Sequence, residues 1–270
     1  MTPATIAEPL TIDGIRQHLS STTDRHLYLF AEVGSTNDCL RDLAGRGARE
    51  GSVVVAEAQR AGRGRLGQRW FSPAGVNIYA SVLFRPAIAP TEVFTFGSIA
   101  SLALVDAIAS LGLPATIKWP NDVLVDGKKV AGTLVDCAMR EKVVEYVILG
   151  AGVNVNVTTA ALREALGDSA GFATSLSQIL GREVDREALL AAWLEGLEAW
   201  RTRWQCDGPS AVQKAWADRD ILTGRRVEVR GGAGTFEGRV LGLEPGGSLL
   251  VLDTLGCRRR ITTEEVRLHD

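Results

Sequence analysis

The stretch from position 116 to position 135 decides the fold, and it reads TIKWPNDVLVDGKKVAGTLV. Its first four residues are typical of a short strand, which ends at Pro120 because proline cannot donate to a strand ladder. The Asp126-Gly127 pair between two valine-containing runs is a strong signal of a tight hairpin turn. The stretch therefore predicts a short strand, a polar turn and a β-hairpin.

Further strands and helices flank this hairpin on both sides. Valine-rich or alternating runs predict strands at 26–33, 51–58, 77–84 and 143–149. Apolar residues at helical spacing predict a long buried helix at 92–111, and shorter patterns predict helices after position 35 and at 175–180, 185–204 and 209–217. The segment 158–174 is rich in turns, and from position 221 onward short strands alternate with glycine turns.

These elements predict an α/β (α+β) fold with a mixed sheet, flanking helices and a small β-barrel at the C-terminus. The expected divisions are an N-terminal extension at 1–23, a catalytic domain at 24–219 and the barrel at 220–270. The extension is too short for a helix-turn-helix module of the usual size.

The composition argues against several classes of protein. A net charge of −2 gives no general attraction to nucleic acid or to an anionic membrane surface. No uninterrupted apolar run approaches the roughly 18 residues of a membrane span, and no signal peptide is evident, so a cytoplasmic protein is expected. The cysteines are far apart and the histidines lie near the two ends, which argues against a zinc site and a histidine-based triad.

Residues 62–70, GRGRLGQRW, form a glycine–arginine loop after a predicted strand. Glycine lets a backbone approach a ligand closely, and arginine matches phosphate or carboxylate oxygens, so we expect this loop to close over an anion. The alternative is a solvated surface loop. Its G-x-G-x-x-G spelling is not a dinucleotide fingerprint, because a strand rather than a helix follows and the next acidic residue is Glu92. A Walker A motif and a recognised nucleic-acid module are also missing from the sequence.

A second group of polar residues follows the strand at 116–119. Asn121 and Asp122 offer oxygens to Mg²⁺, which binds few protein ligands when phosphate oxygens are present, and Lys118 can contact a phosphate. Lys129 lies on the next strand, where regular alternation puts it on the face opposite Gly132 unless a bulge intervenes. Together with the loop, this set fits a nucleoside triphosphate, whose transfer chemistry depends on positioning and charge neutralisation.

Four segments in this order resemble the motifs of biotin protein ligases: Gln59 with 62–70, Lys118–Asp122, Lys129–Gly132, and Gly150–Asn154. Ser35, Thr36 and Asn37 agree with the same pattern, and the match extends from about position 27 to the C-terminus. The resemblance implies formation of biotinyl-5′-adenylate from biotin and ATP, with Mg²⁺. Biotin is then transferred to a lysine of the biotin carboxyl carrier domain of a carboxylase. It also implies that the C-terminal barrel is SH3-like.

The resemblance assigns a role to each matching residue. Lys129 and Arg65 are the expected catalytic residues, with Lys129 between the biotin carboxylate and the α-phosphate. The expected biotin-binding residues are Ser35, Thr36, Asn37, Gln59, Gly62, Arg63, Tyr79, Lys129, Gly132, Gly150 and Gly152. Those expected at ATP are Arg63, Arg65, Trp70, Lys118, Asn121, Asp122 and Asn154, with Asn121 and Asp122 also at Mg²⁺.

The sequence departs from the family pattern in two places. The loop has Gln68 where an arginine is usual, so either one phosphate contact is weaker or Arg69 replaces it. The DNA-binding module of the repressor-type members is missing, so neither repressor activity nor nucleic-acid binding is expected. Two alternatives stay open: a biotin- or adenylate-binding module without catalysis, and a lipoate or octanoyl transferase. A homodimer through the central sheet is expected from the family alone.

Overall fold

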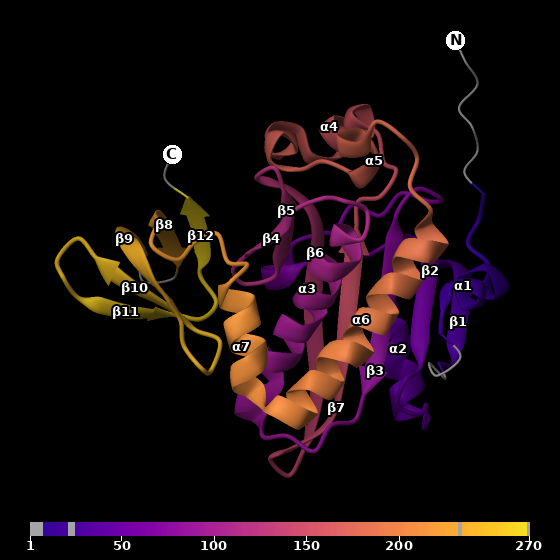
Figure 1. Cartoon of the computed structure of the whole chain (residues 1–270), viewed down its shortest axis with the longest axis horizontal. Coiled ribbons are helices and arrows are strands. Elements are labelled where there is room, and N and C mark those ends of the chain that lie inside the picture. The colour runs from indigo at the N-terminus through magenta and orange to yellow at the C-terminus, as the bar shows by residue number, and fades with distance from the viewer. Residues whose placement is uncertain (1–7, 21–24, 232–233, 269–270) are drawn as a thin grey trace.

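The computed structural model describes residues 8–20, 25–231 and 234–268. A mixed sheet of seven strands forms the centre, in the order β1-β2-β3-β7-β6-β5-β4, and an antiparallel sheet of five strands lies beside it (Figure 1). The central strands are β1 (Leu27–Val33), β2 (Val53–Gln59), β3 (Ile78–Phe84), β4 (Ala115–Lys118), β5 (Asp122–Val125), β6 (Lys128–Arg140) and β7 (Val143–Val153). This architecture confirms the predicted fold class.

Helices cover both faces of the central sheet. On one face, α3 (Val93–Ala109) packs on β4, β6 and β7, and α6 (Arg186–Asp207) packs on α3. On the other face, α2 (Thr36–Gly45) contacts β2, β3 and β7. Strand β3 is apolar except for Ser81 because both of its faces are buried: Val82 and Phe84 belong to the large core under α3, whereas Leu83 belongs to the smaller core under α2.

Helix α3 is apolar enough to cross a membrane by length and composition. The segment Pro90–Ala109 has a mean hydropathy of 1.6, but 67% of it is buried inside the fold. It packs between the sheet and α6, so its composition matches a core position. The sequence has no uninterrupted apolar run long enough to span a membrane, but this helix, which contains a few polar residues, is long and apolar enough by average composition.

Two short helical regions lie outside the strongest sequence patterns. Within the segment read as turn-rich, α4 (Thr159–Leu166) begins after Thr158, whose side chain accepts from the amide of Ala161, and the 3₁₀ helix η3 (Gly167–Phe172) follows. Helix α1 (Ile12–His18) contacts α6 and buries Ile15. The remaining helices are α5 (Leu176–Leu180) and α7 (Pro209–Ala217), with short 3₁₀ turns at Arg65–Gly67 and Pro90–Glu92.

A bulge in β6 corrects the expected orientation of Lys129. Val123 pairs with Ala131 whereas Leu124 pairs with Lys129, so Val130 is an extra residue on the β6 side. The bulge interrupts the alternation, and both Lys129 and Gly132 line the same cavity. A Cβ added at Gly132 would lie 3.5 Å from Lys129 Nζ.

The C-terminal sheet is joined to the edge of the central sheet. Its strands are β8 (Arg226–Gly231), β9 (Gly234–Leu243), β10 (Leu249–Asp253), β11 (Arg258–Ile261) and β12 (Glu265–Leu268). The connecting segment pairs with β4, because Ile117 N donates to Arg219 O at 2.8 Å and Ile221 N donates to Ile117 O at 3.0 Å. Trp119 Nε1 also donates to Gly247 O at 2.9 Å. These bonds attach the connecting segment and the β9–β10 turn to β4 and to the β4–β5 turn.

Candidate functional site

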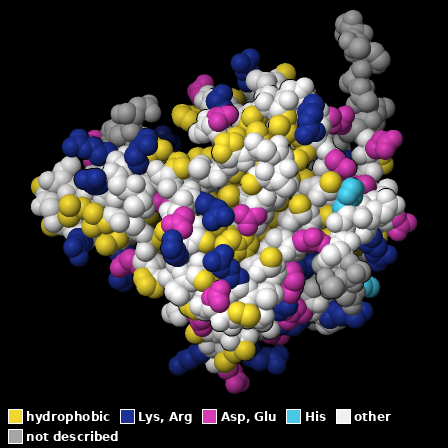
Figure 2. Space-filling model, viewed as in Figure 1, with side chains coloured by type: hydrophobic (Ala, Val, Ile, Leu, Met, Phe, Trp, Pro, Cys, Tyr) yellow, Lys and Arg dark blue, Asp and Glu magenta, His cyan; other side chains and the backbone are white. Residues whose placement is uncertain are grey.

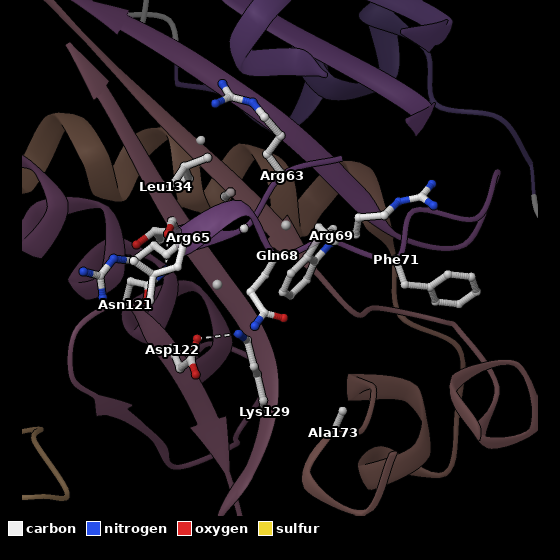
Figure 3. A pocket seen from close by; sticks show the side chains of 18 of the residues that line it. Arg63, Arg65, Gln68, Arg69, Phe71, Asn121, Asp122, Lys129, Leu134 and Ala173 are labelled. Carbon is white, nitrogen blue, oxygen red and sulfur yellow. Dashed lines mark hydrogen bonds and ion pairs between the residues drawn. The ribbon is translucent and has the colours of Figure 1, made fainter. Parts of the chain in front are cut away.

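A cavity of about 410 Å³ lies where the central sheet meets the glycine–arginine loop, the segment 162–173 and the start of β12 (Figure 3). It collects residues from distant parts of the chain because the ends of β2, β4 and β7 converge there. The predicted site residues that line it are Ser35, Thr36, Asn37, Gln59, Arg63, Arg65, Trp70, Lys118, Asn121, Asp122, Lys129, Gly132, Gly150, Gly152 and Asn154.

One end of the cavity is a network of neutral polar groups, which we call the hydrogen-bonded end (Thr36, Asn37, Gln59, Ser72 and Ser81). Gln59 Oε1 accepts from the amide and hydroxyl of Thr36 at 2.9 and 3.2 Å, and Gln59 Nε2 donates to Ser72 Oγ at 3.0 Å. Ser81 Oγ lies 2.8 Å from Thr36 Oγ1 and 2.6 Å from Asn37 Oδ1. The side chain of Ser35 makes no capping bond to α2. The cluster is therefore more than a helix cap.

The other end carries positive charge, and we call it the cationic end (Arg65, Lys118 and Lys129, with Asp122). Lys129 Nζ lies 2.5 Å from Asp122 Oδ1 and 5.2 Å from the ring centre of Trp70 (Figure 3). Arg65 lies over the ring of Trp119 and donates to Thr262 O at 3.4 Å. Across the described residues, neither Arg65 nor Lys118 has a salt-bridge partner.

Burial affects both of these cations. Loss of solvent lowers the pKa of Arg65, and Asp122 opposes the shift. Burial likewise lowers the pKa of Lys118, which Asp122 raises and Lys129 lowers further. A partly desolvated cation without a carboxylate partner binds an anion more strongly than a fully hydrated one. The cationic end is thus suited to phosphate oxygens.

A resident metal site is not apparent, since the described residues contain no group of three or more histidine, cysteine, aspartate or glutamate side chains suited to a metal. Asp122 is half-buried beside Lys118 and Lys129, and Asn121 Nδ2 donates to Thr133 O. Mg²⁺ usually takes one or two protein carboxylates and completes its shell with water and phosphate oxygens. The donors here fit an ion that arrives with a nucleotide.

The glycines of β6 and β7 make room for side chains of the site. A Cβ at Gly152 would lie 2.4 Å from Trp70 Nε1, and one at Gly132 would lie 3.3 Å from the same indole ring. A Cβ at Gly150 would lie 2.2 Å from Asn37 Oδ1. We predicted that these glycines give biotin a backbone surface, and they also admit Trp70 and Asn37 against the sheet.

Three predicted residues lie differently from the expectation. Tyr79 is fully buried and its hydroxyl donates to Pro73 O at 2.9 Å, so the ring is not a wall of the cavity. Gly62 is also absent from the lining, and a Cβ added to it would lie within 3 Å of Ser72 Oγ, Trp70 O and Gln59 Nε2. Arg63 reaches the rim but points away from Lys129 toward two carboxylates (Figure 3).

Gln68 and Arg69 have opposite orientations. Gln68 points toward Asp122 and Lys129, whereas Arg69 turns away and donates to Arg60 O at 3.1 Å (Figure 3). The suggestion that Arg69 takes the place of an arginine at position 68 is therefore not supported by this arrangement.

Sequence reasoning missed several residues of the site. Ser81 and Ser72 complete the hydrogen-bonded end, and Asp136 contacts Asn37. Phe172 lines the mouth of the cavity with 77% of its surface exposed, and Glu264 reaches it from the C-terminal sheet. A serine inside the apolar run of β3 was a usable signal, since polar side chains in a buried strand need partners.

Over the face seen in Figure 2, acidic and basic side chains are interspersed.

Comparisons with known proteins agree with one another. The model of the biotin/lipoate A/B protein ligase family matches residues 29–154. The chain is 34% identical to the bifunctional ligase/repressor BirA of Bacillus spizizenii, over 90% of this chain and 74% of that protein. It is 32% identical to a biotin–[acetyl-CoA-carboxylase] ligase of Paracoccus denitrificans, over 88% of this chain and 98% of that protein. The biotin protein ligase from Aquifex aeolicus, solved in complex with biotin and ATP, superposes with a TM-score of 0.74 at 26% identity, over 91% of this chain and 100% of that one.

Proposed function

The chain belongs to the biotin/lipoate A/B protein ligase family, and on that premise we propose that it is an ATP-dependent biotin–protein ligase. The proposed reaction joins biotin and ATP into biotinyl-5′-AMP and pyrophosphate. It then transfers the biotinyl group to a lysine of a biotin carboxyl carrier domain, and AMP leaves. The observation that carries the proposal is one cavity with a neutral hydrogen-bonded end and a cationic end.

The hydrogen-bonded end suits the ureido ring of biotin. A cyclic urea is neutral and offers one carbonyl acceptor and two N–H donors, and Thr36, Gln59 and Asn37 present both kinds of partner. The groups are already bonded to each other, so little side-chain entropy is lost when a ligand binds. The related ligase from Aquifex aeolicus was solved with biotin and ATP, which supports both as ligands of this cavity.

The cationic end suits the first chemical step. An oxygen of the biotin carboxylate attacks the α-phosphorus of ATP, and the bond to the β-phosphate oxygen breaks to release pyrophosphate. Two anions must approach each other, and Lys129 supplies a compact positive charge between them. Asp122 Oδ1 lies 2.5 Å from Lys129 Nζ and holds the amine at this end of the cavity. Arg65 and Lys118 hold phosphate oxygens.

Mg²⁺, when bound with ATP, neutralises phosphate charge, and Asp122 and Asn121 would be its protein ligands. In the second step, the amine of the acceptor lysine attacks the acyl carbon and AMP departs with both electrons of the cleaved bond. The glycine–arginine loop covers the mixed anhydride and excludes water until then. We also propose the division into a catalytic domain at 24–219 and a C-terminal domain at 220–270.

Biotin-dependent exchange of labelled pyrophosphate into ATP tests the proposal, because it reports adenylate formation without an acceptor protein. We expect exchange with the parent and a loss of about a thousandfold in Lys129→Ala, from removal of a charge needed in the transition state. Lys128→Ala is the matched control, since Lys128 is the exposed neighbour on the same hairpin. Exchange that depends on lipoate instead, or equal exchange in both variants, would exclude the proposed role.

A further inference from the structure

Asp136 of β6 lies between the hydrogen-bonded end and the glycine–arginine loop. Its Oδ2 accepts from Arg63 Nη2 at 2.6 Å, from Arg41 Nη2 at 2.7 Å and from Asn37 Nδ2 at 3.1 Å. One oxygen therefore contacts the loop, helix α2 and a residue of the cavity. The Asp136 side chain is 20% exposed, the least of the four charged residues of this cluster.

Asp38 completes the cluster but has a different set of contacts. Its Oδ1 accepts from Arg63 Nη2 at 2.9 Å and from Arg41 Nη1 at 2.8 Å. Two carboxylates and two guanidinium groups thus alternate, and Arg63 is held by both carboxylates. No hydrogen bond joins Asp38 to Asn37 within the described part of the chain. Asp38 contacts the arginines alone, whereas Asp136 contacts the arginines and the cavity.

Asp136 and the carbonyl of Leu134 together determine which way the amide of Asn37 faces, because Asn37 Nδ2 donates to Asp136 Oδ2 at 3.1 Å and more weakly to Leu134 O at 3.5 Å. A carboxylate can only accept, so it selects Nδ2 and leaves Oδ1 to face Ser81 Oγ at 2.6 Å. The same Oδ1 lies against Gly150, where a Cβ would be only 2.2 Å away. The space around this amide is therefore restricted, and its orientation depends on a correct partner at Nδ2.

We propose that Asp136 is a positioning residue that couples closure of the glycine–arginine loop to the orientation of Asn37. Through Arg63 it fixes the start of the loop, and through Asn37 it fixes the polar groups that receive the ureido ring. The inference rests on the proposed function. It gives Arg63 a role in holding the loop closed, separate from phosphate binding.

A matched pair of variants tests this coupling, Asp136→Ala and Asp38→Ala. Without ligand, hydrogen exchange of amides at 61–70 reports closure of the loop. Both variants remove a charge-assisted bond to Arg63, so exchange there rises by about tenfold in each. Biotin affinity, measured by calorimetry without ATP, falls by about tenfold in Asp136→Ala and changes by less than about twofold in Asp38→Ala.

Two controls separate the outcomes. Exchange outside 61–70 must match the parent in both variants, which excludes a general loss of stability. If Asp136→Ala fails this test, Asp136→Asn replaces it, because it keeps the shape and an acceptor while removing the charge at Arg63. Equal loss of biotin affinity in the Asp38 and Asp136 variants, or unchanged exchange at 61–70, overturns the inference. A parent protein that does not bind biotin refutes the proposed function instead, and the exchange result still tests the contact of Asp136 with the loop.

Discussion

The two ends of the cavity differ in how fully their polar groups are paired. At the hydrogen-bonded end, Gln59 uses both ends of its amide on Thr36 and Ser72, and Ser81 contacts Thr36 and Asn37. At the cationic end, Lys129 has one carboxylate partner, whereas Arg65 and Lys118 have none among the residues that the structure describes.

This difference separates two ways of binding. Paired neutral groups hold their geometry without a ligand, so the hydrogen-bonded end is ready for a ligand of fixed shape. Unpaired cations in a partly desolvated cavity attract any anion that enters. The cationic end can therefore stabilise negative charge at more than one position as that charge shifts during phosphoryl transfer. Changes at the first end should affect binding of biotin, and changes at the second should affect ATP and the adenylate.

The largest effect on biotin affinity is expected from Gly150→Ala at the hydrogen-bonded end. The new Cβ would lie 2.2 Å from Asn37 Oδ1, so the amide must move and lose its bond to Ser81. Overpacking and the lost bond together cost about 3 kcal/mol, which lowers biotin affinity by roughly a hundredfold. Calorimetry with biotin measures this. Gly34→Ala is the control, because nothing lies within 4 Å of a Cβ there, and an equal loss in that variant would contradict the steric explanation.

A smaller effect is expected from Arg65→Ala at the cationic end. Loss of one charge-assisted contact to the adenylate speeds release of biotinyl-5′-AMP by about tenfold, while biotin affinity without ATP stays near that of the parent. Filtration of the enzyme with labelled intermediate measures the released fraction. Arg69→Ala should retain the intermediate like the parent, because its guanidinium already donates to Arg60 O. Retention by Arg65→Ala as tight as by the parent would remove Arg65 from the site.

A still smaller effect is expected on the pH dependence of ATP use, through Lys118. Burial lowers its pKa, so as pH rises the amine loses its charge earlier than an ordinary lysine, and an uncharged amine no longer attracts phosphate. We expect kcat/KM for ATP to fall on the alkaline side by about fivefold as Lys118 deprotonates. In Lys118→Arg, kcat/KM for ATP should stay constant over the same alkaline pH range. An alkaline limb unchanged in Lys118→Arg would assign the titration to another group.

Many of the strands and helices can be predicted from the sequence, because local residue preferences and the pattern of buried residues indicate the same elements. The predicted strands at 26–33, 51–58 and 77–84 match β1, β2 and β3 to within about two residues, which is the usual uncertainty of element ends. The Asp126-Gly127 turn adopts the positive φ angles of 49° and 74° that this pair tolerates. The cavity also collects most of the predicted residues, since each motif lies at a strand end or in the loop.

The parts that sequence could not supply depend on tertiary contacts. The bulge at Val130 moves Lys129 to the side of Gly132, and no propensity marks an extra residue in an apolar strand. The paired carboxylates that attract Arg63 come from α2 and β6, which are almost a hundred positions apart. Helix α4 is only eight residues long and buries Leu162 alone, so its apolar pattern was too short to recognise.

The smallest effect is expected from restoring a charge at position 68 of the loop. Gln68 points toward Asp122 and Lys129, so an arginine there adds a cation to the end that already lacks anionic partners (Figure 3). Position 68 is exposed and screened by solvent, so Gln68→Arg should slow release of biotinyl-5′-AMP by only about threefold. Biotin affinity without ATP should not change, because the hydrogen-bonded end is untouched. The neutral variant Gln68→Met controls for side-chain length. If it slows release as much as Gln68→Arg does, packing rather than charge limits retention at the cationic end.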